Sequence, residues 1–555
     1  MLSILTSVAS AAAAQSQISV RCSPAASSGE QPSCHLSEGV LDRRATAFST
    51  YNKTSNLTTG FATLDIHAAP SVAPRLAAFA AGYAEGFQTA AEIAQFYTNV
   101  YEFGAEGPSR KLTKWVTEND AWTRAQAEQH AATDDYWQSV ATVLDRFDGM
   151  LAGYEASRNA RDVEARLPSL NKIDFLWINL DGDLFDLQNV VGEPPRYGRK
   201  GRAARFQAPD GPMLRCSALF KLAAKQREIF FGHATWDTYA TAAPRVFKHL
   251  TLPVSRGGRT TLRTVSMSSS PGFLASIDDY YLMEDDDHLT TLGVIETSIN
   301  IDDHAAYKAV KPQSVLCWVR SMVANQLALD APGWAAAFGE HASGTYNNQW
   351  MVLDIGRARA SAGAGKPLAA DSFWVLEEVP GLVHAEDQSD HLNTHAYWPS
   401  FNEIYYPATR KVAGARGNYS DAVRFRLFAE LQGSVTSDAA MARVIAWNDY
   451  QHDPIAHGPS DAISMRGDLV KGGARAGGGI DAKYSTLAAA ASGLVSHGRA
   501  GPTNDDQPPF CWTEEFAQTP HVGHPRCFGF QWGSFAPARK EAVAAAAGAA
   551  VEEVA

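Results

Sequence analysis

The sequence predicts an α+β fold in which layers of β-sheet are covered by helices on their outer sides. Apolar runs of strand length occur in groups between residues 213 and 299 and again between 349 and 377, whereas helical periodicity dominates residues 72–165 and 312–328. Strands in groups with helices between the groups are typical of layered sheets with a helical cover. Apolar residues make up 45% of the 555 residues, which suffices for a large core, and no stretch reads as a linker between independent folds.

The N-terminal part is expected to be mostly helical. Residues 61–66 alternate loosely and predict a strand, and residues 72–165 predict helices with amphipathic stretches at 77–97 and 134–154. Residues 173–180 form an apolar run of strand length, so we expect a strand there.

The chain is predicted to be organised around a β-hairpin that follows a flexible segment. Residues 188–212 are rich in Gly, Pro and Arg without apolar periodicity, which predicts an exposed, mobile loop. Apolar runs at 213–222 and 229–236 with a polar turn between them then predict a hairpin. Cys216 lies at the start of the first strand and His233 near the end of the second. A thiol and an imidazole would therefore meet at one end of a sheet.

Beyond the hairpin, alternating groups of elements are predicted. Residues 236–250 and 312–328 are expected to be helices, and residues 536–555 an Ala-rich, frayed tail. Strands are expected at residues 261–267, 272–277, 280–283, 292–299, 349–354 and 372–377.

Charge and leader features indicate a protein of the secretory route. The net charge of -12 argues against nucleic acid or an anionic membrane surface as the main partner, and would suit an acidic compartment. Residues 1–15 are apolar and end in small residues, as a signal peptide does, although they lack a positively charged start. No later stretch approaches 18 uninterrupted apolar residues, so we expect no transmembrane span. Three N-x-S/T triplets are glycosylation acceptors, at Asn52, Asn56 and Asn418.

Six cysteines are few for this length, so the fold is expected to depend on its core. Cys22 with Cys34, and Cys511 with Cys527, are plausible short-range disulfides in an oxidising compartment. Cys317 lies on the apolar side of the 312–328 helix and is expected to be buried, which leaves Cys216 outside these assignments.

No metal or cofactor site is predicted. No CxxC, HExxH or similar ligand spacing occurs, and the acidic run at 284–288 reads as a solvated loop.

Several long stretches resemble the phospholipase B-like family, a branch of the N-terminal nucleophile hydrolases, from about residue 59 to about residue 530. The stretches that carry the resemblance are SSSPGFLASIDDYYLM (268–283), VKPQSVLCWVRSMVANQLALD (310–330), SGTYNNQWMVLD (343–354), VLEEVPGLV (375–383), NDYQHDPIA (448–456) and AGGGIDAK (476–483). The resemblance implies a four-layer αββα sandwich of the N-terminal nucleophile hydrolase type.

The resemblance also implies a nucleophile, Cys216. In such hydrolases the base is the nucleophile's own α-amine, which exists only after the preceding bond is cut, and an α-amino pKa near 7.7 to 8 makes it a usable proton acceptor. We therefore expect self-cleavage between Arg215 and Cys216, giving an N-terminal fragment, 16–215, and a C-terminal fragment that begins at the nucleophile, 216–535.

Further site residues follow from matching motifs. In GHATW, His233 would orient or assist the nucleophile, and Trp236 would contact substrate, as would Thr297 in ETSI. Asn402 in YWPSFN is suited to donate to the oxyanion. Arg424 in VRFRLF would hold the thiolate or a substrate carbonyl, and Arg426 is its close competitor.

Other polar residues in conspicuous motifs are expected to be structural because each lies in a turn-like context. These residues are Asn347, Asn348, His452, Asp453 and Asp481.

The resulting hypothesis is a secreted or lysosomal acyl hydrolase that removes fatty acyl chains from glycerophospholipids through a Cys216 thioester. Its partner would be a phospholipid or another acylated lipid. An amidase that acts on N-acyl substrates is the first alternative, because it would use the same nucleophile and oxyanion site. A lipid-binding or scaffolding protein whose site no longer turns over is the second.

Overall fold

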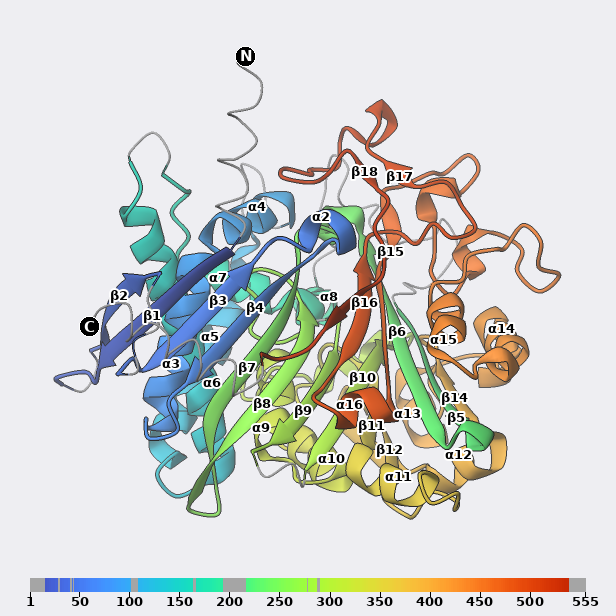
Figure 1. The fold of residues 1–555 in the computed structure, drawn as a ribbon, viewed down its shortest axis with the longest axis horizontal. Helices are drawn as coiled ribbons and strands as arrows, with labels where there is room; N and C mark the ends of the chain where they lie inside the picture. The colour runs from blue at the N-terminus through green and yellow to red at the C-terminus, as the bar shows by residue number, and fades with distance from the viewer. Residues whose placement is uncertain are drawn as a thin grey trace, which may run out of the picture.

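The computed structural model describes residues 15–27, 30–39, 42, 44–100, 108–162, 166–192, 216–276, 278–286 and 290–538. These residues build two large layers of strands with helices around them (Figure 1). The α+β class predicted from the sequence is confirmed. The predicted signal peptide lies almost wholly outside the described residues, as do most of the 188–212 loop and the Ala-rich tail.

The larger sheet contains strands from the N-terminal part of the chain and from its middle part. Its order is β13-β12-β11-β10-β9-β8-β7-β4-β3-β1-β2, and β4 pairs with β7 in parallel while the other neighbours are antiparallel. The strands are β1 (Gln15–Ser23), β2 (Ser33–Glu38), β3 (Ala47–Asn52), β4 (Phe61–Ala68), β7 (Arg245–Arg256), β8 (Arg259–Ser269), β9 (Tyr280–Asp285), β10 (Thr291–Ser298), β11 (Asn348–Asp354), β12 (Phe373–Val379) and β13 (Leu382–Asp387). Segments before and after residue 215 therefore share one sheet.

The smaller sheet contains the predicted hairpin. Its order is β14-β5-β6-β15-β16-β19, and β5 and β6 are antiparallel neighbours, which confirms the hairpin. The strands are β14 (Tyr397–Ser400), β5 (Cys216–Ala223), β6 (Glu228–Thr238), β15 (Gly477–Thr486), β16 (Ser496–Ala500) and β19 (Gly533–Phe535). A separate pair, β17 (Phe510–Cys511) and β18 (Cys527–Phe528), carries one disulfide.

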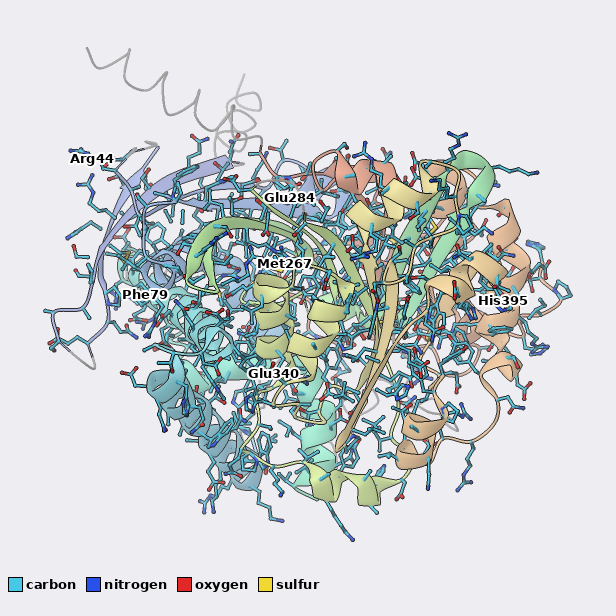
Figure 2. All side chains as sticks on the ribbon, turned by 90° about the horizontal axis from the view of Figure 1, so that it is seen from below. Arg44, Phe79, Met267, Glu284, Glu340 and His395 are labelled. Carbon is cyan, nitrogen blue, oxygen red and sulfur yellow. A yellow bond between two sulfur atoms is a disulfide. The ribbon has the colours of Figure 1, made fainter. Side chains whose placement is uncertain are left out.

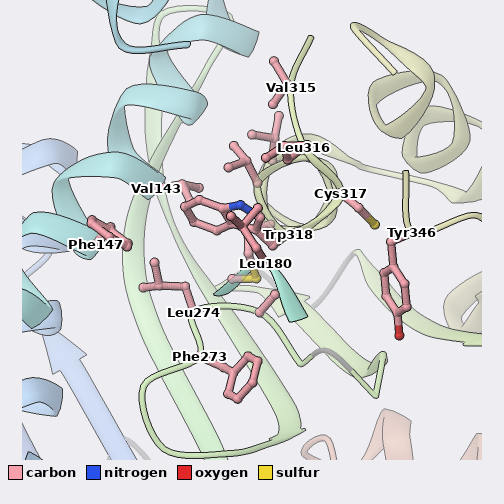
Figure 3. Close-up of a cluster of buried hydrophobic side chains, with 14 of the residues drawn as sticks. Val143, Phe147, Leu180, Phe273, Leu274, Val315, Leu316, Cys317, Trp318 and Tyr346 are labelled. Carbon is pink, nitrogen blue, oxygen red and sulfur yellow. The ribbon is translucent and has the colours of Figure 1, made fainter. Parts of the chain in front are cut away.

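Helices cover one face of the larger sheet. They are α3 (Pro74–Gln88), α4 (Ala90–Val100), α5 (Arg110–His130), α6 (Asp135–Asn159), α7 (Lys172–Asn179), α8 (Asp181–Val190), α9 (Cys317–Leu327) and α10 (Ala331–Gly339). Trp318 of α9 packs in a cluster with Val143 and Phe147 of α6 and with Leu274 (Figure 3). Helices α3 and α6 approach closely because Gly82 has no side chain: a Cβ there would lie 2.0 Å from the Arg146 carbonyl oxygen.

The two sheets pack face to face. Phe220 and Phe231 of the smaller sheet share a buried cluster with Phe247 and Ile295 of the larger. On the other face of the smaller sheet, α14 (Val423–Leu431) and α15 (Asp438–Ile445) bury apolar residues against Leu219 and Phe230. The remaining short helices are α2 (Asn56–Thr59), α11 (Ile355–Ala362), α12 (Ser389–His395), α13 (Pro407–Ala413) and α16 (Leu487–Ala491). Side chains fill the space between these layers, and His395 lies at the edge of the molecule (Figure 2).

Most other elements agree with the sequence. The strands expected at 61–66, 261–267, 280–283, 292–299, 349–354 and 372–377 correspond to β4, β8, β9, β10, β11 and β12, and the 312–328 helix corresponds to α9. Both predicted disulfides, Cys22–Cys34 and Cys511–Cys527, are present, and Cys317 is buried. Among the described helices, none has both the length and the apolar character needed to cross a membrane.

Four predictions of local structure were wrong, beginning with the strand at 173–180, which is helix α7. Asn171 and Asp174 form a reciprocal capping box that starts this helix. Periodicity alone does not separate a short buried helix from a strand, and the cap decides.

The prediction of a helix at 236–250 is also wrong. This segment is the end of β6, a short 3-10 turn (Tyr239–Thr241) and the start of β7. Strand β7 pairs with β4 on one side and β8 on the other and is buried on both faces, so its sequence shows no alternation.

The other two errors concern residues near chain turns. In the 272–277 stretch the described residues form turns and not a strand. Their backbone bonds to side chains instead of to a neighbouring strand, since the Leu274 N–H donates to Asn179 and the Ala275 carbonyl oxygen accepts from Ser269. The Ser276 hydroxyl in turn donates to the Ser268 carbonyl oxygen. The run at 284–288 is not a fully solvated loop, since Asp285 ends β9, is buried and pairs with Arg263 and Arg256. The first residues of the predicted 188–212 loop, Gln188 to Val190, belong to α8.

Candidate active site

Cys216 is the first residue of β5 and lies between the two sheets. It is opposite Thr235 in the hairpin, and His233 is opposite Ala218. Because alternate residues of a strand share a face, the Cys216 side chain is on the same face as Ala218 and Phe220, which pack toward the larger sheet. Only 3% of Cys216 is exposed.

Asn402 contacts the backbone of Cys216. Its Oδ1 lies 3.4 Å from the Cys216 backbone nitrogen, and its Nδ2 donates to the Ser298 carbonyl oxygen at 2.7 Å. Asn402 has a positive φ of 73°, a conformation that Asn adopts more readily than most residues. The backbone strain and the two hydrogen bonds fix the amide beside Cys216.

Arg424 of α14 joins the same residues. It donates to the Cys216 carbonyl oxygen at 2.6 Å, to the Ser217 hydroxyl at 3.0 Å and to Asn402 Oδ1 at 2.7 Å. Its guanidinium carbon lies 4.4 Å from the centre of the Trp236 ring. Burial lowers the pKa of Arg424 to about 10, so the side chain remains a cation at physiological pH.

The structure thus separates Arg424 from its competitor. Arg426 is exposed on the same helix, whereas Arg424 is buried against Cys216. Trp236, which the sequence suggested as a substrate contact, stacks on Arg424 and donates from Nε1 to the Ile463 carbonyl oxygen at 3.0 Å.

His233 is fully buried next to the thiol. Its Nδ1 lies 3.2 Å from the Thr235 hydroxyl. Burial, together with the positive charge of Lys483, holds the pKa of His233 well below its usual range, so the imidazole is neutral. A sulfur of Cys216, a nitrogen of His233 and a carboxylate oxygen of Glu296 all lie within 4.8 Å of one another. These are ligand types that Zn²⁺ accepts, so these residues could hold a metal ion.

Thr297 lies on β10 and links the sheets. Its hydroxyl is 2.6 Å from the hydroxyl of Ser400 on β14. Its two sequence neighbours also lie at the site: Glu296 is close to Cys216 and His233, and the Ser298 carbonyl oxygen accepts from Asn402.

A buried group of four charged residues adjoins the hairpin and was missed from sequence. Asp278 and Asp481 accept from Arg245 at 2.5 and 2.7 Å, and from Lys483 at 2.5 and 2.9 Å. Burial alone would raise the pKa of Asp278, but Arg245 and Lys483 more than offset this and hold it below the usual range. Lys483 also donates to Thr235 at 2.5 Å, so the group supports the strand end opposite Cys216.

Asp481 therefore requires a correction, because it was expected in a turn and lies in the interior of β15, fully buried. The available signal was the Asp-Ala-Lys spacing, which puts Asp481 and Lys483 on one face of a strand. Asn347, also expected to be structural, is buried and donates to Asp186 at 3.0 Å.

A cavity of about 30 Å³ lies beside Cys216. Its walls include Thr235, Trp236, Arg245 and Tyr346. A cavity of this size is large enough to contain a water molecule.

Comparison with known proteins shows the family of the chain. The family model for phospholipase B matches residues 47–535. Human phospholipase B-like 1 is 32% identical over 519 residues, covering 91% of this chain and 89% of that protein. Phospholipase B-like protein B of Dictyostelium discoideum is 30% identical (86% and 84% covered), and phospholipase-B 81 of Drysdalia coronoides is 29% identical (90% of each chain covered).

The protein is thus an α+β protein related to lipid hydrolases. The chain belongs to the phospholipase B family.

Proposed function

We propose that the protein is an N-terminal nucleophile hydrolase that removes fatty acyl chains from glycerophospholipids through a thioester on Cys216. Membership in the phospholipase B family supports the lipid substrate. The observation that carries the mechanism is the contact of Asn402 Oδ1 with the backbone nitrogen of Cys216, because that nitrogen becomes the α-amine after cleavage. The two facing sheets with outer helices are taken as the four-layer sandwich of this hydrolase type.

In the proposed reaction the α-amine of Cys216 accepts the thiol proton, and the thiolate sulfur attacks the acyl carbonyl carbon. A free thiol with a pKa near 8.5 is mostly protonated at neutral pH, so a base is required. Collapse of the tetrahedral intermediate breaks the ester bond, and the alcohol leaves with the proton held by the amine. Water then attacks the thioester, which releases the fatty acid and restores the thiol.

The neighbouring residues have supporting roles in this proposal. The Asn402 amide stabilises the oxyanion through the Nδ2 hydrogen that is not donated to the Ser298 carbonyl oxygen, and Arg424 positions the Cys216 carbonyl and the Asn402 side chain. Neutral His233 orients the thiol, and Trp236 and Thr297 border the substrate. No cofactor is required by this scheme.

Activation follows from the same nucleophile. The Cys216 sulfur attacks the Arg215 carbonyl carbon, the peptide nitrogen leaves as the Cys216 α-amine, and water opens the resulting thioester. Both fragments stay together because β4, from the first fragment, is paired with β7, from the second. An N-terminal leader and the three glycosylation acceptors favour a secreted or lysosomal location.

Two alternatives remain distinct from this proposal. An amidase of N-acyl substrates would share the nucleophile and the amine base. A lipid-binding protein without turnover would share only the fold, and the Cys216, Asn402 and Arg424 contacts favour an active enzyme over it.

Purified protein should run as two bands on a denaturing gel, and the larger fragment should begin Cys-Ser-Ala-Leu-Phe. The processed protein is then incubated with phospholipids and with N-acyl amides while released fatty acid is measured. We expect release from phospholipids. Release from amides alone would favour the amidase, and an active single chain would exclude the α-amine mechanism.

A further inference from the structure

A second and larger pocket lies on the edge of the smaller sheet. It has a volume of about 310 Å³, which is at the lower end of the range for small-ligand sites. We call it the aromatic pocket, and its lining residues are His391, His395, Tyr397, Trp398, Pro399, Tyr405, Tyr419, Ser420 and Phe425. It shares none of the described residues that line the cavity beside Cys216. His395, at its rim, lies at the edge of the molecule (Figure 2).

The pocket walls are aromatic rings set at large angles to one another. The Trp398 and Tyr405 ring centres are 4.7 Å apart at 57°, and those of Tyr405 and Tyr419 are 5.3 Å apart at 87°. The His391 ring meets Trp398 at 4.9 Å and 67°. Because the rings are not stacked flat on one another, several ring faces or edges border the same pocket.

These rings are held in place by the surrounding fold. Trp398 is buried and donates from Nε1 to Gln349 Oε1 at 3.2 Å. The Tyr419 hydroxyl donates to the Pro399 carbonyl oxygen, and the backbone nitrogen of Tyr405 donates to Glu377 at 2.6 Å. A preformed pocket costs little ordering when a ligand binds.

The described lining of the pocket has no Lys or Arg that would repel a cation. Burial, followed by the negative charges of Glu386 and Glu377, raises the pKa of Tyr405. Burial and the proximity of His395 lower the pKa of His391 to about 4, so this ring is neutral at physiological pH. The described lining also contains no Asp or Glu, so its ring faces are what can attract a cation there.

We propose that the aromatic pocket binds a quaternary ammonium group. Such a group has no N–H to satisfy, is bulky enough to touch several rings, and is attracted by the negative faces of Trp and Tyr. The group could belong to the choline headgroup of a lipid surface or to a small soluble choline compound. The site is separate from Cys216, so it would hold a headgroup without taking part in bond cleavage.

Binding is tested on the purified full chain with choline chloride and its neutral isostere, 3,3-dimethylbutan-1-ol, followed by saturation-transfer NMR of the methyl protons. We expect choline to bind at least about threefold more tightly. The comparison separates cation recognition from simple apolar filling. Equal binding of the two probes, or no choline binding, would overturn the proposal.

Matched variants at Tyr405 test the role of the ring. Tyr405→Leu keeps an apolar side chain and removes the π face, and should weaken choline binding at least about fivefold, whereas Tyr405→Phe should bind as the parent does. Phe425→Leu provides a second variant if Tyr405→Leu does not fold, as judged by thermal melting. Equal loss in Tyr405→Phe and Tyr405→Leu would contradict recognition by the ring.

Two further binding measurements identify the source of the quaternary ammonium group. Flotation measures binding to vesicles of phosphatidylcholine or of phosphatidylglycerol, and a separate titration measures binding of soluble phosphocholine. Preferential binding to phosphatidylcholine vesicles that Tyr405→Leu reduces supports a lipid headgroup. Binding of phosphocholine without vesicle binding supports a soluble choline compound. These measurements use no turnover, so their failure is distinguishable from failure of the acyl hydrolase proposal.

Discussion

Arg424 and Asn402 are joined by a hydrogen bond of 2.7 Å from the guanidinium to Oδ1. Because Arg can only donate, this bond determines which end of the amide is the oxygen, and the amide nitrogen accordingly faces the Ser298 carbonyl. The same Oδ1 then faces the Cys216 nitrogen at 3.4 Å. One buried arginine therefore sets the orientation of the side-chain amide that contacts the backbone of Cys216.

Arg424→Lys is expected to lower kcat by about 10²-fold, the cost that a displacement of about 1 Å has in well-oriented sites. An ammonium group cannot reproduce contacts to Cys216 and Asn402 together with stacking on Trp236. The exposed Arg426→Lys is the matched control and should keep full activity. Equal effects of the two substitutions on kcat would show that Arg424 has no specific role in turnover.

Asn402→Ala should reduce kcat by about 10²-fold or more with little change in KM, as expected for loss of an oxyanion donor. Since Asn402 has a φ of 73°, Ala also introduces backbone strain. Asn402→Gly removes the side chain without that strain and should lose the same activity while melting at a higher temperature than Asn402→Ala. A change confined to KM would make Asn402 a substrate contact.

Cys216→Ser should abolish or greatly weaken turnover and slow self-cleavage, because a hydroxyl is a poorer nucleophile than a thiolate. Cys317→Ala is the control, since Cys317 is the other buried cysteine outside the two disulfides. Burial raises the pKa of Cys317, so it is not a reactive thiol. The ratio of cleaved to intact chain, measured on gels, should be normal in the control.

Asp183 should contribute a loss of stability as the pH rises from about 4 to about 7. Burial raises the pKa of Asp183 to about 7 in the folded chain, so the folded state binds a proton in this window that the unfolded state has released. The effect is at most about 4 kcal/mol and is complete above pH 7. Burial also raises the pKa of Asp279, to about 8, in the same direction.

Asp183→Asn tests this dependence because the amide stays neutral and can still accept from Thr345. Denaturant titrations at pH 5 and pH 8 should show a smaller loss of stability in the variant than in the parent. An unchanged difference between the two pH values would mean that Asp183 is ionised in the folded state.

Added Zn²⁺ should inhibit turnover reversibly, because Cys216, His233 and Glu296 bring sulfur, nitrogen and oxygen ligands together at the nucleophile. EDTA should restore activity, and Mg²⁺ should have no effect since it prefers oxygen ligands. Cd²⁺ binding, followed by thiolate absorbance in the ultraviolet, should disappear in Cys216→Ser. The double variant Glu296→Gln, His233→Ala tests the other two ligands, provided that it retains measurable activity. If the Zn²⁺ concentration that inhibits the parent also inhibits this variant, the metal binds elsewhere.

Local sequence patterns predicted the hairpin, the two disulfides and the amphipathic helices α3, α4 and α6. These features depend on neighbouring residues: periodicity, turn composition and Cys spacing are local properties. Long matching stretches also identified the family, which the comparisons confirm. The positions named for the site in the sequence lie in motifs, and Cys216, Asn402, Arg424 and Trp236 do meet in space.

Features that depend on residues far apart in the chain could not be predicted from local patterns and became clear from the packing of the sheets and helices. Strand β7 read as a helix because its pairing with β4 and β8 buries both faces and removes the alternation. Arg245 pairs with Asp278 and Asp481, and these ion pairs offset the free-energy cost of burying each charge. The partners are far apart in the chain, so no local sequence pattern predicts the pairing. The choice of Arg424 over Arg426 was likewise made by packing, since two residues along a helix point to different sides and only one side faces Cys216.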